Sequence, residues 1–235
     1  MIRLRPAAQR GHFDHGWLDT WHTFSFGHYH DPAHMGFRAL RVINDDVIAA
    51  GEGFGMHGHR DMEIITWVLD GALEHRDSLG HGSVLRHGDV QRMTAGSGIR
   101  HSEFNHAQDQ ALRLLQIWIL PAQEGLDPGY EEASLPAEGR RGALQLVAAP
   151  LGQGGAVRIH QDVRVYVTEL AAGQSVTLDL DAGRHAWVQV ARGDLALGDV
   201  TMGEGDGAAV SEEGSLVLTG RGEGGPAEAL VFDLA

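Results

Sequence analysis

Short apolar segments separated by turn residues run along the whole chain, and they rarely show the three-to-four-residue spacing of an amphipathic helix. Glycine accounts for 33 of the 235 residues, which fits frequent tight turns. The strongest segment, Leu112–Ile119, ends shortly before Pro121. This pattern predicts an all-β protein built as a sandwich or barrel. The candidate strands are Arg38–Ile43, Ile64–Leu69, Val84–Leu85, Leu112–Ile119, Leu144–Ala148, Val163–Leu170, Trp187–Val190, Ser215–Leu218 and Ala229–Phe232.

A weak internal repeat indicates that one structural unit occurs twice. The segment Trp67–Leu73 resembles Trp187–Leu195 with a two-residue insertion, and the Gly-Asp turn in His87–Val90 resembles the one in Glu204–Gly207. A strand, a glycine turn, a second strand and a Gly-Asp turn is the rhythm of a duplicated β-barrel, although Gly-Asp turns by themselves are common. The predicted fold is therefore a pair of double-stranded β-helix (jelly-roll) barrels packed in one chain.

The polar stretch 121–141 interrupts the strand pattern and is interpreted as the connection between the barrels, with room for one short helix. The expected division is a first barrel over residues 1–125, a linker over 126–142 and a second barrel over 143–235.

Two residue types are missing altogether. Without cysteine the chain has no disulfide, thiolate metal site or cysteine nucleophile, and without lysine it has neither a PLP Schiff base nor a P-loop lysine. The net charge of −14 argues against direct binding of nucleic acid. No apolar run approaches the roughly 18 residues of a membrane span, and none follows the basic start as it would in a signal peptide. A cytoplasmic location, with no membrane partner, is therefore expected.

Charge and histidine are distributed unequally between the halves. Residues 1–120 contain 11 arginines and 14 acidic residues, a net charge of −3, whereas residues 121–235 contain 7 and 18, a net charge of −11. Thirteen of the 15 histidines lie before residue 120. The first half is therefore expected to carry the chemistry, and the second half to be a solvated partner.

Two short motifs in the first half suggest a metal site. His57 and His59 are two residues apart, as are His101 and Glu103. In an extended segment such residues point to the same face, about 6–7 Å apart along the strand, and can share one ion. A lone His-x-His is more often found on a surface, but a second spaced pair changes that balance. Three imidazole nitrogens and one carboxylate suit Fe(II), Mn, Co, Ni, Cu or Zn better than Ca or Mg.

The other histidines are weaker candidates. His28, His30 and His34 surround an Asp-Pro turn, and they are interpreted as a loop folded over the site or packed between the barrels rather than as a second metal cluster. Asn105 and His106 are candidates for contacts behind the ligand pair. The histidines expected at the surface or in turns are His12, His15, His75, His81, His87 and His106.

Longer motifs support a family resemblance. The region from His57 to Glu63 looks like the first cupin motif, although its glycine, Gly71, falls one residue late, and the second motif has Thr94 where proline is usual. These departures are typical of one branch, the pirin family of bicupins, and the match is dense from about residue 15 to 130. The segments that resemble pirins are Thr23–Pro32, His57–Ile64, Leu73–Ser78, Gly88–Gly96, Gly98–Glu103 and Gln116–Ile119.

The pirin resemblance implies one divalent metal ion, usually iron, in the first barrel. Carried over residue by residue, its ligands are His57, His59, His101 and Glu103. Fe(II) is the expected ion, with Ni, Co, Cu, Mn and Zn as alternatives. Many other cupins use the carboxylate that corresponds to Glu63, which in pirins is expected behind the metal, where it orients a ligand histidine.

The second repeat lacks such ligands. Alignment of the two tryptophans places Thr177 and Asp179 opposite the first histidine pair, and alignment of the Gly-Asp turns places Leu218 and Gly220 opposite the second pair. The second barrel is therefore expected to be structural, shielding or partner-binding.

The resemblance also implies an activity, the ring-opening of a flavonol such as quercetin by O₂ with release of CO, in which Glu103 accepts the proton of the flavonol 3-hydroxyl. Apolar residues near the ligands are candidates to enclose the substrate, and each fits the barrel core equally well: Phe54, Met56, Trp67, Met93 and Phe104. The alternative function is an iron-dependent, redox-sensing regulatory protein without turnover, which binds a protein partner through the acidic second half.

Overall fold

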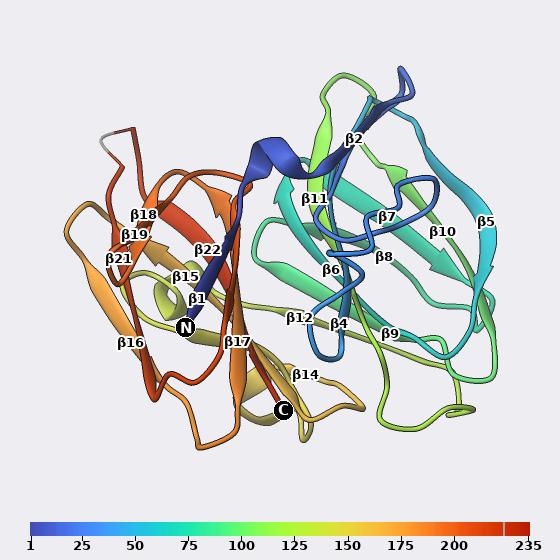
Figure 1. Cartoon of the computed structure of the whole chain (residues 1–235). Coiled ribbons are helices and arrows are strands. Elements are labelled where there is room, and N and C mark those ends of the chain that lie inside the picture. The colour runs from blue at the N-terminus through green and yellow to red at the C-terminus, as the bar shows by residue number, and fades with distance from the viewer. Residues whose placement is uncertain (223) are drawn as a thin grey trace.

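The computed structural model describes residues 1–222 and 224–235 and contains two jelly-roll barrels side by side (Figure 1). Each barrel consists of a seven-stranded sheet and a four-stranded sheet. Among the described residues, no helix is long and apolar enough to cross a membrane. The helical turns are the 3-10 segments η1 (Ala7–Gln9), η2 (Ala137–Gly139) and η3 (Gln153–Gly155).

The first barrel carries the early histidine motifs. Its seven-stranded sheet has the order β12-β9-β6-β11-β4-β3-β2, and its four-stranded sheet has the order β5-β10-β7-β8. The strands are β2 (Gly11–Asp14), β3 (Leu18–His22), β4 (Leu40–Ile48), β5 (Gly53–His59), β6 (Glu63–Asp70), β7 (Ala72–Asp77), β8 (Gly82–Arg86), β9 (Asp89–Thr94), β10 (Ile99–Asn105), β11 (Leu112–Ile119) and β12 (Gly129–Ser134).

The second barrel repeats this plan with sheets of order β1-β20-β17-β22-β15-β13-β14 and β16-β21-β18-β19. Its strands are β1 (Ile2–Arg5), β13 (Gln145–Ala149), β14 (Val157–Arg158), β15 (Val163–Leu170), β16 (Ser175–Asp179), β17 (His185–Arg192), β18 (Leu195–Leu197), β19 (Val200–Met202), β20 (Gly207–Val210), β21 (Ser215–Gly220) and β22 (Ala227–Leu234).

The prediction of a β-barrel pair is confirmed, and each candidate strand overlaps an observed one. Two segments depart from the expected division of the chain. Residues 2–5 form β1, which pairs with β20 in the second barrel, and residues 129–134, expected within the linker, form β12, which pairs with β9 in the first. Both are edge strands, whose partners are distant in sequence and leave no local signal. The short helix expected in the connection is the single turn η2.

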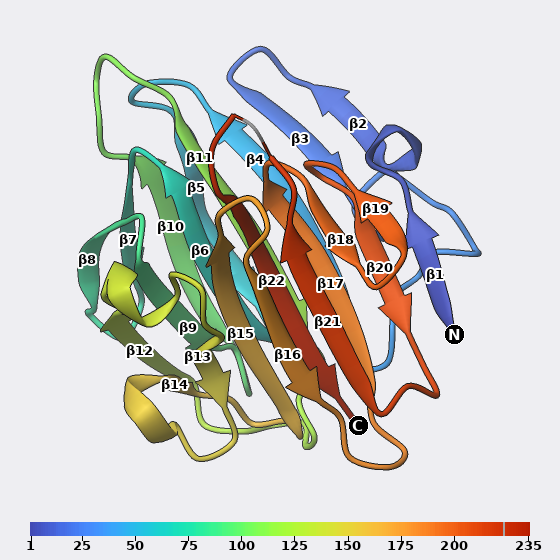
Figure 2. The same ribbon diagram turned by 90° about the vertical axis from the view of Figure 1, so that its left-hand side faces the viewer.

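The two barrels share one hydrophobic core because their seven-stranded sheets pack face to face. Figure 2 shows β15, β22 and β17 overlying β6, β11 and β4. Strands alternate their faces, so one set of side chains on β6 and β11 faces the other barrel. Trp67 and Ile117 of the first barrel accordingly belong to the same buried cluster as Val165 and Phe232 of the second.

The interiors of the two barrels differ in character. The second barrel is filled by one continuous apolar cluster that includes Val188, Leu218 and Val231. In the first barrel the apolar residues form two separate clusters, one around Leu73 and one around Met93. The first barrel also buries polar side chains on β4, β6, β9 and β10, and several of these build the site.

Candidate metal centre

The site is built on β5, an edge strand of the four-stranded sheet, and on its neighbour β10. The two strands are antiparallel, with His57 opposite His101 and His59 opposite Ile99. The register then shifts between His101 and Glu103, so that Glu103 pairs with Phe54. Such an irregularity redirects side chains within a ladder. Both expected ligand pairs therefore lie on adjacent strands.

The three histidines converge on one point. The ring centroids lie 4.7 Å apart for His57 and His59, 4.5 Å for His57 and His101, and 4.8 Å for His59 and His101. One nitrogen from each ring lies within 4.8 Å of the other two. The structure thus brings together the three histidines that the two motifs suggested.

The environment of the rings favours metal binding. The Nδ1 atom of His57 lies 2.8 Å from the Gly55 carbonyl oxygen, so it carries the proton and leaves Nε2 as a donor to a metal. Burial, with the nearby imidazoles, lowers the pKa of His101 to about 2 and that of His59 to about 4. Both rings are therefore neutral near pH 7, the state that a metal ligand requires.

His101 provides the test of fit. It is buried, and neither ring nitrogen has a hydrogen-bond partner among the described residues. An unsatisfied buried polar atom costs roughly 1–3 kcal/mol, so a purely structural histidine here would be unfavourable. A metal ion at the centre of the three rings would satisfy one of these two nitrogens. The residues present fit a mononuclear metal.

Glu103 lies beside this centre and is held from behind. Its Oε1 accepts hydrogen bonds from Gln91 Nε2 at 2.7 Å and from Thr66 Oγ1 at 3.4 Å, and its Oε2 accepts one from Gln116 Nε2 at 2.8 Å. Its Oε1 lies 4.0 Å from Nδ1 of His101. Burial raises the pKa of Glu103 to about 7, and the three donors offset part of this effect.

The expected role of Glu63 is not the one that the structure shows. Glu63 is fully buried at the start of β6, but its side chain points toward the second barrel. Its Oε2 accepts a hydrogen bond from the backbone N–H of His160 at 3.2 Å and lies 3.4 Å from that ring's Nδ1. Because successive residues of a strand face opposite sides, Ile64 lines the metal cavity instead. Glu63 therefore contacts the other barrel and not a ligand histidine.

A cavity of about 210 Å³ opens onto the three histidines. Its walls are largely aromatic, and Trp118 packs edge-on against His59 at 4.9 Å. Its lining also contains Glu103 and polar side chains of β4 and β11. The lining residues besides the histidines and Glu103 are Phe26, Asn44, Asp46, Phe54, Ile64, Gln116 and Trp118.

Of the five apolar residues expected to enclose a substrate, the cavity lining includes Phe54. Met56 and Phe104 point outward and are exposed, while Met93 is buried in a cluster below the site. Trp67 faces the second barrel and donates a hydrogen bond from Nε1 to Glu228 Oε1 at 2.7 Å. These residues were chosen because they lie near the ligands in the sequence, and that nearness does not show which face of its strand each of them occupies.

The histidine-containing loop after β3 borders the cavity of the first barrel and also contacts the second barrel, since Tyr29 OH accepts a hydrogen bond from Arg5 of β1 at 2.7 Å. His28 lines a cavity that adjoins the metal cavity, and His34 is tied to Asp31 by a 2.7 Å contact between Nδ1 and Oδ2. Asn105 and His106 do not contact the ligand pair from behind. Asn105 donates to backbone carbonyls, including that of Gln110, and the ring of His106 contacts Glu74.

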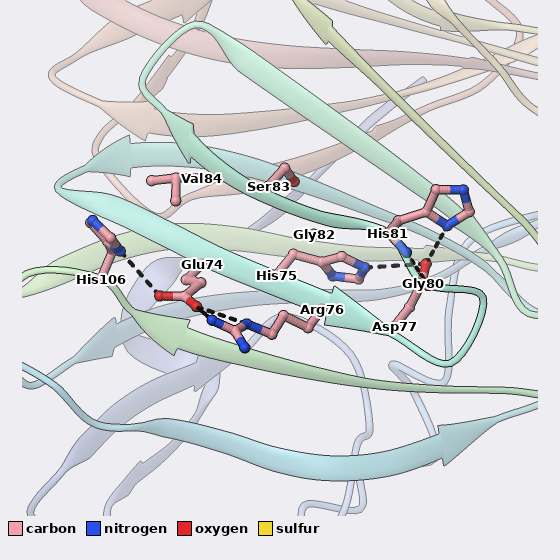
Figure 3. A pocket seen from close by; sticks show the side chains of 10 residues that line it. All are labelled: Glu74, His75, Arg76, Asp77, Gly80, His81, Gly82, Ser83, Val84 and His106. Carbon is pink, nitrogen blue, oxygen red and sulfur yellow. Dashed lines mark hydrogen bonds and ion pairs between the residues drawn. The ribbon is translucent and has the colours of Figure 1, made fainter.

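His75, expected at the surface, is buried behind the metal centre. Its Nδ1 lies 4.0 Å from Glu103 Oε1, and its Nε2 lies 3.6 Å from Asp77 Oδ2. Figure 3 shows His75 and Asp77 among the residues that line a separate groove on this sheet, where Asp77 also contacts His81. The groove has a volume of about 800 Å³. The His75 ring thus lies between the Glu103 carboxylate of the site and Asp77, which lines the groove.

The second barrel places apolar side chains where the first has ligands. In the structure Val176 lies opposite Leu218, as His57 lies opposite His101, and Val176 and Leu178 face inward. The expected counterparts, Thr177 and Asp179, are exposed. A one-residue error in register exchanges the faces of a strand, and the connecting loops of the two barrels differ in length.

Another group of metal-binding residue types lies where the barrels meet, and its charges are already paired. It consists of His87, Glu169 and Glu228. Glu169 forms an ion pair with Arg140, and Glu228 contacts both His87 and Arg192. These charges act as a polar junction between the barrels.

The buried polar residues around Glu103 were not anticipated as site residues. Thr66, Gln91, Gln116, Asn44 and Asp46 are buried or lie at inward positions on four different strands. The signal available in the sequence was a polar residue at an inward position within an otherwise apolar strand.

Comparison with known proteins agrees with this architecture. Residues 3–119 match the family model for pirin, and residues 146–234 match the model described as the quercetinase C-terminal cupin domain. A protein of Escherichia coli K12 named quercetin 2,3-dioxygenase is 45% identical over 235 residues, which cover 100% of this chain and 99% of that protein. A pirin-like protein of Caulobacter vibrioides is 40% identical, with 93% and 94% coverage.

Solved structures give the same result. The bacterial pirin YhhW of E. coli in complex with nickel(II) superposes with a TM-score of 0.92 at 44% identity, covering 100% of this chain and 99% of that one. Two barrels, a three-histidine centre confined to the first of them, and relatives similar over their full length lead to one conclusion: this chain belongs to the pirin family of bicupins.

Proposed function

We propose that this pirin is a metal-dependent dioxygenase that opens the central ring of a flavonol such as quercetin with O₂ and releases CO. The observation that carries the proposal is the convergence of His57, His59 and the unpartnered His101 at an aromatic-lined cavity. The E. coli relative named quercetin 2,3-dioxygenase supports the reaction, and the nickel complex of YhhW supports a metal.

In this proposal the three histidines hold one divalent ion, with Glu103 as the fourth ligand, and Fe(II) is the resident ion. The same nitrogen and oxygen donors also accept Ni, Co, Cu, Mn or Zn. When bound, the ion supplies sites for the flavonol oxygens and for reaction with O₂. His59 and His101, whose pKa values are lowered, stay neutral near pH 7 and are ready to bind a metal.

Glu103 has the properties of a proton acceptor. It stands 4.0 Å from His101, and its burial brings its pKa to about 7, near the value at which general bases work well. Gln91 and Gln116 fix the carboxylate from two sides. We propose that Glu103 takes the proton of the 3-hydroxyl, which makes the flavonol electron-rich enough to react with O₂. Phe26, Phe54 and Trp118 would keep water from the ring that is cleaved.

The test is reconstitution with each metal. Protein stripped of metal and reloaded anaerobically with Fe(II) or Ni(II) should bind about one ion per chain and, in air, consume quercetin with release of CO. His59→Ala should lose both metal and turnover, whereas His30→Ala, in an exposed loop position, should retain both. Loaded protein that releases no more CO than His59→Ala would contradict the proposal.

A further inference from the structure

A second cavity adjoins the metal cavity. It has a volume of about 170 Å³ and extends toward β2, β3 and the loop that follows β3. The two cavities share Phe26, Asn44, Asp46 and Phe54, so they are two lobes joined at a waist rather than separate pockets. We call them the metal lobe and the outer lobe.

Aromatic rings continue from the metal centre into the outer lobe. Trp118, which packs on His59, lies 5.2 Å from Phe26, and Phe26 lies 5.3 Å from His22. His22 in turn lies 5.4 Å from Phe13. Burial lowers the pKa of His22 to about 4, so this ring is neutral. Such a lining suits a flat, uncharged ring.

The waist is polar. Asn44 and Asp46 lie two residues apart on β4, so both point to the same face of that strand. Asp46 Oδ1 accepts a hydrogen bond from Thr20 Oγ1 at 2.5 Å. Asn44 Oδ1 is buried and has no hydrogen-bond partner among the described residues. A ligand that spans both lobes would therefore meet the histidines and Glu103 at one end, both rings and polar groups at its middle, and a mainly aromatic wall in the outer lobe.

We propose that the outer lobe is the subsite for the pendant aryl ring of the substrate. The inference rests on the proposed flavonol activity and specifies how that substrate lies. The fused rings bearing the oxygens that reach the metal occupy the larger metal lobe. The single bond to the pendant ring passes the waist, where a narrow passage is enough, and Phe13, His22 and Phe26 surround the ring.

The experiment compares two ligands that differ only in the pendant ring, 3-hydroxyflavone and 3-hydroxychromone. Their dissociation constants are measured anaerobically on Ni(II)-loaded protein by quenching of tryptophan fluorescence, and their turnover is measured in air. The wild type should bind 3-hydroxyflavone tighter by roughly tenfold or more, the expected effect of burying one aromatic ring.

Two variants test the outer lobe, and a third serves as a control. His28→Trp adds bulk at an exposed residue of the lining, and Phe13→Ala removes a wall. Each should weaken binding of 3-hydroxyflavone about tenfold and leave 3-hydroxychromone unchanged. His30→Trp makes the same exchange two residues further along the loop, outside the lining, and should behave as wild type.

The outcomes separate the two proposals. If neither variant alters the preference between the ligands, or if both ligands weaken equally, the outer lobe is not the aryl subsite, whatever the turnover. If the preference changes as expected but neither ligand is consumed, the subsite stands as a binding site and the dioxygenase proposal fails.

Discussion

At the scale of single residues, the interior of the first barrel is distinguished by a group of polar side chains around Glu103, here called the polar row. Thr66, Gln91 and Gln116, from β6, β9 and β11, all donate to Glu103. Each is buried or nearly so, and their hydrogen bonds repay part of the cost of removing a carboxyl group from water. The row fixes one acid next to the three histidines, and it divides the apolar core in two.

Replacing Glu103 by glutamine tests whether its carboxylate acts in the reaction. The amide keeps the volume but cannot accept a proton, so kcat at equal metal occupancy should fall by roughly 10²–10⁴-fold, the usual contribution of a general base. Metal content should fall less, because the three histidines remain. CO release and elemental analysis measure the two effects. A variant that loses its metal but turns over normally per bound ion would show that Glu103 is a ligand without a catalytic role.

Asp46 is a second buried acid, and it predicts a pH dependence of stability. Burial, opposed in part by the Thr20 hydroxyl, raises its pKa from 3.8 to about 7. The folded state therefore keeps its proton longer than the unfolded chain does. This contribution to stability is complete below about pH 4 and is lost as the pH rises to about 7.

Asp46→Asn removes this titration while its side-chain oxygen can still accept the Thr20 hydrogen bond. Relative to wild type, the variant should gain stability as the pH rises from about 4 to about 7, and then remain level. The gain is at most about 4 kcal/mol, since one pKa unit corresponds to about 1.4 kcal/mol. Urea unfolding of both metal-free proteins across this range measures it. Parallel curves for the two proteins would show that the carboxyl group of Asp46 ionises freely in the folded state.

The ligand histidines could be found from the sequence because each motif is local and its two-residue spacing has a direct geometric meaning. Each member of the polar row stands out as a polar residue in an apolar strand, but that Thr66, Gln91 and Gln116 meet could not be predicted, because they meet only through the register of three strands. His75 was missed for a similar reason. Nothing in its neighbourhood distinguishes a surface histidine from one whose strand turns it inward.

At the scale of strands, the close approach of β5 to β10 determines where the ligands lie. A Cβ added to Gly53 would lie 2.3 Å from the Glu103 carbonyl oxygen and 2.5 Å from Phe104 Cα. Those backbone atoms cannot yield without separating the strands. Glycine at this position therefore lets β5 sit close enough for His57 and His59 to reach His101.

Gly53→Ala should displace β5 and loosen the metal site. The strain should cost about 1–3 kcal/mol of stability, and a shifted histidine pair should weaken metal binding by about tenfold or more. Chelator competition and urea unfolding measure these effects. Gly55→Ala is the matched control on the same strand, since a Cβ there meets nothing within 4 Å. Equal behaviour of the two variants would mean that β5 is free to adjust.

Strand prediction succeeded where a segment is buried on both sides. Leu112–Ile119 and Val163–Leu170 were expected with the bounds observed for β11 and β15, which lie inside their sheets with apolar residues on both faces. β5 reads poorly as a strand because it is rich in glycine and histidine and lies at a sheet edge. All of its residues are exposed or half-buried, so no apolar alternation marks it as a strand.

At the scale of the whole molecule, the second barrel contributes a wall and not a ligand. Trp67 and Ile117 come from strands whose opposite faces line the interior of the first barrel, and they pack on Phe232 and neighbouring residues of the second. The repeat in the sequence predicted two barrels, but not which faces meet. The position of Trp67 and Trp187 on this shared surface explains why the repeat was most visible around them.

The shared core predicts that the barrels unfold together. Phe232 is fully buried and pairs with Trp187 across β22 and β17. Phe232→Ala should cost about 3–5 kcal/mol, the usual effect of truncating a buried phenylalanine. The substitution leaves a void that lies against the seven-stranded sheet of the first barrel. The destabilisation should therefore extend to β11. In native-state hydrogen exchange, β11 and β22 should lose protection by similar amounts.

Val217→Ala controls for the substitution itself, because Val217 is exposed on β21 and its truncation should change stability by less than about 0.5 kcal/mol. Protection of β11 that stays at the wild-type level while β22 opens would mean that the barrels are independent units. In that case the metal site would not depend on the second barrel for its rigidity. Coupled loss would instead explain why a barrel without ligands accompanies the one that has them: the wall behind β6 and β11 holds the polar row in register.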